Sequence, residues 1–167
     1  MSRDMQLEIR QTTKADISRV MEILDQARQF MWSIGNTAQW PKGYPARETI
    51  ERDVELGNGY VCCNEEGKVV ATFCFAPGPD ATYNKIEDGA WLNDEPYHVI
   101  HRVASDGSVR GLGKLIIDWC KARDKNLRFD THADNKVMQA LAEHNGFQRC
   151  GIIYVANGTP RIAYQTD

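Results

Sequence analysis

A glycine-containing turn is the stretch of this chain whose residue types and spacing most directly indicate chemistry. Residues Val109-Arg110-Gly111-Leu112-Gly113 follow an extended apolar segment and lead straight into a stretch with helical spacing of apolar residues. The first turn of a helix has backbone N–H groups that are not paired within the helix, and these groups bind anions. The sequence therefore predicts a site for a phosphate-bearing ligand at this turn.

Two common phosphate-binding motifs fit the turn poorly. A Walker loop requires G-x-x-x-x-G-K-[ST], but Leu115 follows Gly113-Lys114, and the spacing back to Gly107 is one residue too long. A dinucleotide fingerprint requires G-x-G-x-x-G after the first strand, but Ile116 stands at the third glycine position and the turn lies late in the chain. The first motif is rejected, and the match to the second is weak.

Composition and charge argue against several classes of protein. The chain has 167 residues and a formal net charge of -3, with basic and acidic residues mixed along it, so neither nucleic acid nor a membrane is expected as a partner. Its five cysteines form no C-x-x-C pair, and their odd number favours reduced thiols in the cytoplasm and no metal site. No apolar run is long enough to span a bilayer.

Hydrophobic periodicity and turn signals predict a mixed α/β fold in which helices cover the faces of a sheet. The predicted order is β-α-α-β-β-β-α-β-α-β-β, and no repeat or linker divides residues 1–167, so one domain is expected. The helices are expected to begin near Ile17, Ala46, Leu112 and Asn135, the first of them after a Thr13-x-x-Asp16 capping box. The strands are expected at residues 7–10, 60–63, 68–76, 97–104, 127–132, 148–155 and 161–164.

The turn and its surroundings resemble the GNAT superfamily of acyl-CoA-dependent N-acyltransferases. The matching features are R-G-L-G at residues 110–113 after a strand, Asn135 at the start of a later helix, and N-G-F at residues 145–147, where that helix ends. By element order the resemblance covers residues 7–165, and it is residue-specific over residues 101–147. It implies the GNAT fold, in which two parallel strands splay apart at the centre of the sheet.

The resemblance also implies a binding site for acetyl-CoA, with no metal. The family's turn reads R/Q-x-x-G-x-G/A, and its backbone N–H groups hold the pyrophosphate, while the preceding strand pairs with the pantetheine arm. Leu115 stands where the family has Gly or Ala, but the N–H groups remain, so binding is still expected. The implied cofactor-binding residues are Arg102, Val103, Ala104, Val109, Arg110, Gly111, Leu112, Gly113, Lys114, Leu115 and Asn135.

The residue that protonates the leaving thiolate is not evident in the sequence. The family frequently has a tyrosine five residues before the Phe of the G-F pair, and here this position is Ala142. Another side chain or solvent must then supply the proton. The nearby candidates are Tyr154 and His144, with Cys150 a weaker third.

A base is also required, because an ammonium group must lose a proton before its nitrogen can attack a thioester. His101 is the first candidate, since it lies on the strand expected to flank the thioester and histidine titrates near neutrality. His132, at the end of the next strand, is the second. A backbone N–H of Val103 or Ala104 is expected to stabilise charge on the thioester oxygen.

Aromatic residues in irregular segments are the candidates for the acceptor site. These are Trp40, Tyr44, Trp91, Tyr97 and His98, and their types predict a small, partly apolar acceptor. The chain is thus expected to be an N-acetyltransferase that moves an acetyl group to the primary amine of a small molecule or peptide by direct attack in a ternary complex. Two alternatives remain open, an acyl-CoA-binding sensor with weak or no turnover and an interaction protein whose sheet edge forms a homodimer.

Overall fold

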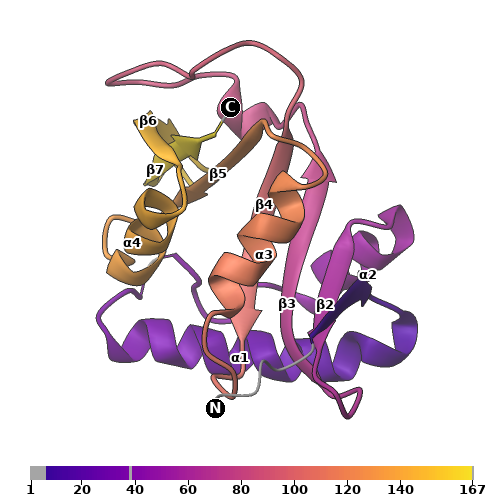
Figure 1. Ribbon diagram of the computed structural model, residues 1–167. Helices are drawn as coiled ribbons and strands as arrows, with labels where there is room; N and C mark the ends of the chain where they lie inside the picture. The colour runs from indigo at the N-terminus through magenta and orange to yellow at the C-terminus, as the bar shows by residue number, and fades with distance from the viewer. Residues whose placement is uncertain (1–6, 38, 167) are drawn as a thin grey trace.

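The computed structural model describes residues 7–37 and 39–166, and a seven-stranded mixed sheet lies at its centre (Figure 1). The strands are β1 (Glu8–Gln11), β2 (Gly59–Cys63), β3 (Val69–Pro77), β4 (His98–Ser105), β5 (Leu127–Thr131), β6 (Gln148–Tyr154) and β7 (Pro160–Gln165). Their spatial order is β1-β2-β3-β4-β5-β7-β6, and the β4–β5 pair is parallel while the other pairs are antiparallel. The predicted fold class and element order are confirmed.

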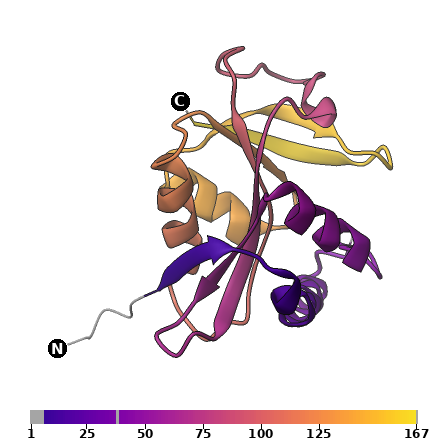
Figure 2. The ribbon, with the colours of Figure 1, turned by 90° about the vertical axis from the view of Figure 1, so that its right-hand side faces the viewer.

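Helices cover both faces of the sheet. The helices are α1 (Ile17–Ser33), α2 (Arg47–Leu56), α3 (Leu112–Lys121) and α4 (Lys136–His144), with short 3₁₀ turns η1 (Lys14–Asp16) and η2 (Ala81–Tyr83). In Figure 2 the sheet is seen edge-on, with α1 and α2 on one side and α3 and α4 on the other. Apolar side chains at helical spacing form the inner face of each long helix, and burial of this face holds the layers together.

The capping box before α1 is present as predicted. The Asp16 carboxylate accepts the Thr13 N–H at 2.7 Å and also pairs with Arg10 of β1 at 2.7 Å. The hydrogen bond from Arg10 is the main reason that the pKa of Asp16 falls to about 2, despite an opposing contribution from burial. This pair therefore connects the first strand to the start of the first helix.

Two apolar cores lie between the layers. One contains α3, α4 and the sheet residues that face them, and the other contains α1, α2 and the opposite face. The five cysteines are free thiols and all are buried in these layers. Among the described residues, no helix has the length and apolar character needed to cross a membrane.

The parallel strands β4 and β5 separate after a short pairing. Their register includes His98 opposite Leu127 and Val99 opposite Arg128, and no further pair follows along the two strands. Beyond Val99 the backbone of β4 has no partner on its β5 side within the described residues. The splayed central pair implied by the resemblance is therefore present, and it opens the sheet at its centre.

A β-bulge in β4 contributes to this opening. Thr72 of β3 lies opposite Ala104, and Cys74 lies opposite His101, so β4 has one more residue than β3 over this interval. Arg102 lies within the bulge with a φ of 51°, in the left-handed region that non-glycine residues rarely adopt. Bulges bend a strand and re-aim its side chains, and this bulge lies beside the separation from β5.

Candidate active site

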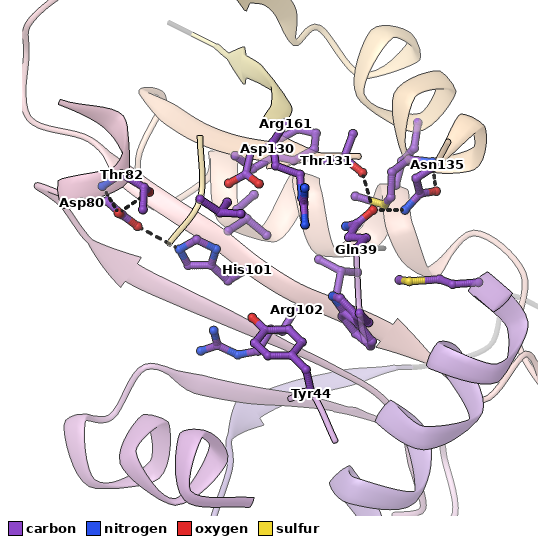
Figure 3. Close-up of a pocket in the computed structure, with 18 of the residues that line it drawn as sticks. Gln39, Tyr44, Asp80, Thr82, His101, Arg102, Asp130, Thr131, Asn135 and Arg161 are labelled. Carbon is purple, nitrogen blue, oxygen red and sulfur yellow. Dashed lines mark hydrogen bonds and ion pairs between the residues drawn. The ribbon is translucent and has the colours of Figure 1, made fainter. Parts of the chain in front are cut away.

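The separation of β4 from β5 contains a cavity of about 440 Å³ (Figure 3). Its walls come from both strands, from the inner faces of α3 and α4, from the start of β7 and from the irregular segment before α2. Most of the lining is apolar, with polar side chains among it, which is the usual composition of a small-molecule site. The polar lining residues are Gln39, Tyr44, Asp80, Thr82, His101, Arg102, Asp130, Thr131, Asn135, Asn157 and Arg161.

His101 lies on β4 just before the bulge and is held by Asp80. Its Nε2 lies 3.2 Å from Asp80 Oδ2, and both side chains are about three-quarters buried. Asp80 is itself fixed by the N–H and hydroxyl of Thr82, at 2.9 and 2.6 Å, and its own N–H donates to Tyr97 Oη at 2.9 Å. Because an ionised carboxylate only accepts, the proton of a neutral His101 lies on Nε2 and Nδ1 is the basic nitrogen.

The charge of Asp80 is strongly favoured by these contacts. Hydrogen bonding from His101 is the largest cause of a fall in its pKa from 3.8 to about 2, and Thr82 adds to it against the opposing effect of burial. A carboxylate whose pKa is lower in the folded state stabilises the fold above its unfolded pKa. This contribution disappears as the pH falls from about 4 through about 2.

Asp80→Asn is therefore expected to destabilise the protein by about 1–2 kcal/mol at pH 7. The difference from the parent chain should shrink as the pH is lowered from 4 towards 2, because the parent carboxyl then becomes protonated as well. Urea unfolding at several pH values measures both effects. Asp118→Asn is the matched control, since Asp118 pairs with Lys114 on the exposed side of α3 and about half of its side chain is accessible. An equal pH-dependent loss in both variants would contradict the account.

Three further charged residues line the cavity. Arg102 extends towards α2 and pairs with Asp53 at 2.6 Å. Asp130 of β5 accepts the hydroxyl proton of Tyr83 at 2.7 Å, and burial raises its pKa. Arg161 of β7 is buried, which lowers its pKa from the usual value. The cavity therefore has the donors, acceptors and charges needed to orient a polar ligand.

The predicted anion-binding turn lies at the start of α3. Gly111 precedes the helix with a φ of 77°, and its carbonyl accepts the N–H of Leu115 at 3.1 Å. Among the described residues, the N–H groups of Leu112, Gly113 and Lys114 have no hydrogen-bond acceptor. Gly113 also lines the cavity, so the unpaired N–H groups lie beside it. This arrangement suits a phosphate group at a helix N-terminus.

The other residues of the turn have separate surroundings. Val109 and Leu115 pack against the core beneath the sheet, and Leu112 is buried in it. Arg110 is exposed, and Lys114 pairs with Asp118 one helical turn later.

Gly111→Ala is expected to cost about 1 kcal/mol of stability, because its left-handed φ is unfavourable for alanine. An added Cβ at Gly111 would meet no atom within 4 Å, so the cost is conformational and not steric. Gly111→Asn is the control, since asparagine adopts this conformation more readily and should cost less. Urea unfolding of both variants tests this prediction, and equal stability of the alanine variant and the parent would contradict it.

Asn135 caps α4 at the far end of the cavity. Its side-chain oxygen accepts the Met138 N–H at 3.1 Å, and its Nδ2 lies 3.3 Å from Gln39 Oε1. The same oxygen of Gln39 accepts the His132 N–H at 3.1 Å and lies 3.3 Å from the Thr131 hydroxyl. Gln39 thus ties the irregular segment before α2 to the end of β5 and the start of α4.

The structure brings part of the predicted site together at the cavity. The predicted residues that line it are Trp40, Tyr44, His101, Arg102, Val103, Gly113 and Asn135. Trp40 is also buried against the core, so it contributes both to core packing and to the cavity wall. Ala104 directs its side chain to the opposite core, beside α1.

Other predicted residues lie away from the cavity. His98 stacks on Phe75, with ring centroids 4.4 Å apart, and its Nδ1 bonds Asp124 at 2.8 Å. Trp91 packs against Tyr83, in a smaller apolar cluster that also contains Val99, Ile153 and Ala163. Tyr97 does not line the cavity but supports Asp80 through the hydrogen bond described above.

The predicted proton donors and the second base are also outside the cavity. Tyr154 is exposed on β6, and His144 is exposed at the end of α4. Cys150 is buried, with its thiol directed at the Gln148 carbonyl, and burial raises its pKa. His132 Nδ1 accepts the Asp134 N–H at 3.0 Å in the loop before α4. The geometry therefore gives none of these four residues a place beside His101.

Several cavity residues were not singled out from the sequence, namely Gln39, Asp80, Thr82, Asp130 and Arg161. Asp130 had a detectable signal, because a carboxylate within an otherwise buried short strand requires a partner or a function. Asp80 and Arg161 gave none, since each lies in an ordinary turn or strand start. Within the described part of the chain, no cluster of His, Cys, Asp and Glu residues is placed to hold a metal ion.

Comparison with known proteins agrees with this geometry. The sequence profile of the acetyltransferase (GNAT) family matches residues 18–147. A crystal structure of a GNAT-family acetyltransferase from Streptococcus agalactiae 2603 has 29% identity and a TM-score of 0.87, covering 96% of this chain and 94% of that one. A GNAT-family acetyltransferase from Listeria monocytogenes 4b F2365 has 20% identity and a TM-score of 0.72, with 96% and 94% coverage.

A more distant structure contains ligands. AAC(6')-Ib, in complex with parmomycin and acetyl-CoA, has 16% identity and a TM-score of 0.63, covering 96% of this chain and 92% of that one. At this identity the similarity concerns the fold. A search of curated protein sequences finds no match. The family profile spans more than half of the sequence, and the fold agrees across nearly all of it, so the chain belongs to the GNAT family of acetyltransferases.

Proposed function

We propose that the protein transfers an acetyl group from acetyl-CoA to the primary amine of a small molecule or peptide, by direct attack in a ternary complex. The observation that carries the proposal is the position of His101. It faces the cavity from β4, with Asp80 bound to Nε2, at the point where β4 separates from β5. A basic Nδ1 in this position is suited to accept the proton of an incoming amine.

The residues around the cavity fit coenzyme A. The unpaired N–H groups of residues 112–114 would hold the pyrophosphate, and the β4 edge left open by the splay would bind the pantetheine arm. Val103 lies on this edge and lines the cavity, while Asn135 and Gln39 form its far wall. When bound, acetyl-CoA supplies an activated acyl group as a thioester.

Two side chains and one backbone N–H group then have separate tasks in the transfer. His101 Nδ1 accepts the proton of the ammonium group, directly or through water, so that the nitrogen can attack the carbonyl carbon. The Val103 N–H stabilises negative charge on the carbonyl oxygen as the new C–N bond forms. Asp80 holds the imidazole in the required tautomer and stabilises the imidazolium.

Cleavage of the C–S bond requires a proton for the thiolate. Ala142, at the position where the family frequently has tyrosine, is fully buried in the core. Among the described residues, Tyr44 is the one tyrosine that lines the cavity, and 38% of it is exposed. We assign the proton to Tyr44 or to solvent, because Tyr154, His144 and Cys150 lie elsewhere.

The acceptor would occupy the part of the cavity between His101, Tyr44 and Trp40. The fold is compatible with amine acceptors, since a protein with a similar fold was solved with parmomycin and acetyl-CoA. Five free thiols are consistent with the cytoplasm as the place of action. A homodimer formed through the sheet edge stays a prediction.

Thermal shift with coenzyme A, followed by thiol release from acetyl-CoA with a panel of primary amines, tests the proposal. Stabilisation by coenzyme A together with amine-dependent thiol release is the expected result. Stabilisation with no turnover on any amine would favour a sensor of acyl-CoA. No stabilisation at millimolar coenzyme A would contradict the proposed function altogether.

A further inference from the structure

Two of the charged residues that line the cavity attract each other without forming an ion pair. Asp80 is paired with His101, and Arg102 is paired with Asp53. Asp130 and Arg161 line the same cavity, yet within the described residues neither forms an ion pair, with the other or with a third group. Because the two charged groups are not in direct contact, each compensates the burial of the other only in part, and a ligand of opposite charge could bind to each of them.

Arg161 offers the cationic half of this pair. Only 5% of the residue is exposed, and its Nη1 donates to Thr159 Oγ1 and to the Pro160 carbonyl, both at 2.9 Å. These acceptors are neutral and use one nitrogen of the guanidinium. Its other donors remain available at the cavity wall, where a guanidinium can bind a carboxylate through two parallel hydrogen bonds.

Asp130 offers the anionic half. Its Oδ2 accepts the Tyr83 hydroxyl at 2.7 Å, which fixes the carboxyl group and leaves Oδ1 without a protein donor among the described residues. Opposite charge on an approaching ammonium group would favour the ionised form of Asp130 and offset its burial. Figure 3 shows Asp130 and Arg161 together on one wall, across the cavity from Tyr44 and Arg102.

The sheet register explains why these two side chains are near each other. Asp130 of β5 lies opposite Ala163 of β7. Arg161 is two residues before Ala163, so it lies on the same face of the sheet as Asp130, on the diagonal. The backbones of diagonal neighbours are roughly 7–8 Å apart, and long side chains can span this distance, yet Asp130 and Arg161 form no ion pair, so a small molecule can bind between their charged groups.

We propose that the acceptor is a small zwitterion, with its ammonium group at Asp130 and its carboxylate, or a comparable anionic group, at Arg161. The inference rests on the proposed function, because it assigns a class of acceptor to the same cavity. An α-amino acid has the required pair of charges within a few bonds of each other. The ammonium group at Asp130 would lie in the same cavity as His101, which is needed for removal of its proton.

Binding and turnover should both be measured on a panel of α-amino acids and the matching amines that lack the carboxyl group. Calorimetry in the presence of coenzyme A gives the affinity of each acceptor, and thiol release from acetyl-CoA gives kcat/KM. For the best amino acid, kcat/KM is expected to exceed that of its matching amine by about 10²-fold or more, because the amine leaves Arg161 unpaired.

Variants assign this preference to the two side chains. Arg161→Gln should bring the ratio between amino acid and amine close to one, and Arg161→Lys should leave an intermediate ratio, because it keeps the charge without the planar fork. Asp130→Asn should raise KM for both kinds of acceptor, which share the ammonium group. Arg149→Gln is the matched control, since Arg149 is exposed on the neighbouring strand β6, outside the cavity.

Three results would overturn the inference. One is the absence of a preference, seen as equal affinity for amino acids and matching amines or as binding of neither. The second is an unchanged ratio in Arg161→Gln. The third is loss of coenzyme A affinity in this variant, which would assign Arg161 to the cofactor. Failure of the proposed function has a different signature. In that case an amino acid would bind in an Arg161-dependent manner without any thiol release, and the assigned class of ligand would stand.

Discussion

Replacement of His101 by alanine is expected to lower kcat for acetyl transfer by about 10²- to 10⁴-fold while coenzyme A binding is retained. Among the described residues, His101 is the histidine that lines the cavity. Asp80 contacts its Nε2, so Nδ1 is left available as a base. Without it, the ammonium group must lose its proton to solvent. Steady-state kinetics over a range of pH, together with calorimetry for coenzyme A, measure the two effects separately.

His144→Ala is the matched control for this change. His144 is exposed at the end of α4 and lies outside the cavity, so its loss should leave kcat within a few fold of the parent. His132→Ala tests the second predicted base, which the structure places in the loop before α4. A His101 variant with parental kcat across the whole pH range would remove this residue as the base.

Gly113→Asp is expected to lower coenzyme A affinity by about 10³-fold. A carboxylate at this position would face the phosphate held by the α3 N–H groups, and two like charges about 4 Å apart near a protein surface repel by about 4 kcal/mol. The variant should still fold, because an acidic residue is favourable in the first turn of a helix. A Cβ at Gly113 would come within 2.6 Å of Leu141 Cδ2, the end of a side chain that can move.

Two further variants separate the causes of this loss. Gly113→Ala introduces the contact with Leu141 without charge and should weaken binding much less than the aspartate. Lys114→Gln removes one exposed cation from the next position and should cost about tenfold or less. If Gly113→Asp bound coenzyme A with unchanged affinity in calorimetry, the phosphate would have to bind elsewhere.

Local sequence signals account for the parts of the site that lie within one segment. The turn at residues 109–113 joins a strand to a helix, and its conformation follows from Gly111 and from the amphipathic pattern that starts at Leu112. The capping box at Thr13 and Asp16 is equally local. Such features depend on neighbouring residues only, so the structure confirms where they lie and how they are built.

The composition of the cavity depends on long-range pairing, which the sequence does not reveal. Asp80, Asp130 and Arg161 come from three distant segments that meet through the β3–β4 and β5–β7 registers. The alternation of side chains between the two faces of a strand also decides which residues face the cavity. His98 and His101 are three residues apart on β4 and therefore point to opposite faces, so only one of them can lie beside the thioester. The bulge at Arg102, which re-aims the strand, has no clear signal in the residues themselves.

A crystal structure with acetyl-CoA or coenzyme A bound tests the central claim most directly. The account predicts that the pyrophosphate contacts the N–H groups of residues 112–114, that the pantetheine arm runs along β4 where it leaves β5, and that the sulfur lies near His101. An amine placed at the thioester should then be within hydrogen-bond reach of His101 Nδ1, directly or through one water. A cofactor bound outside this opening, or a sulfur too far from His101 for such contact, would contradict the account.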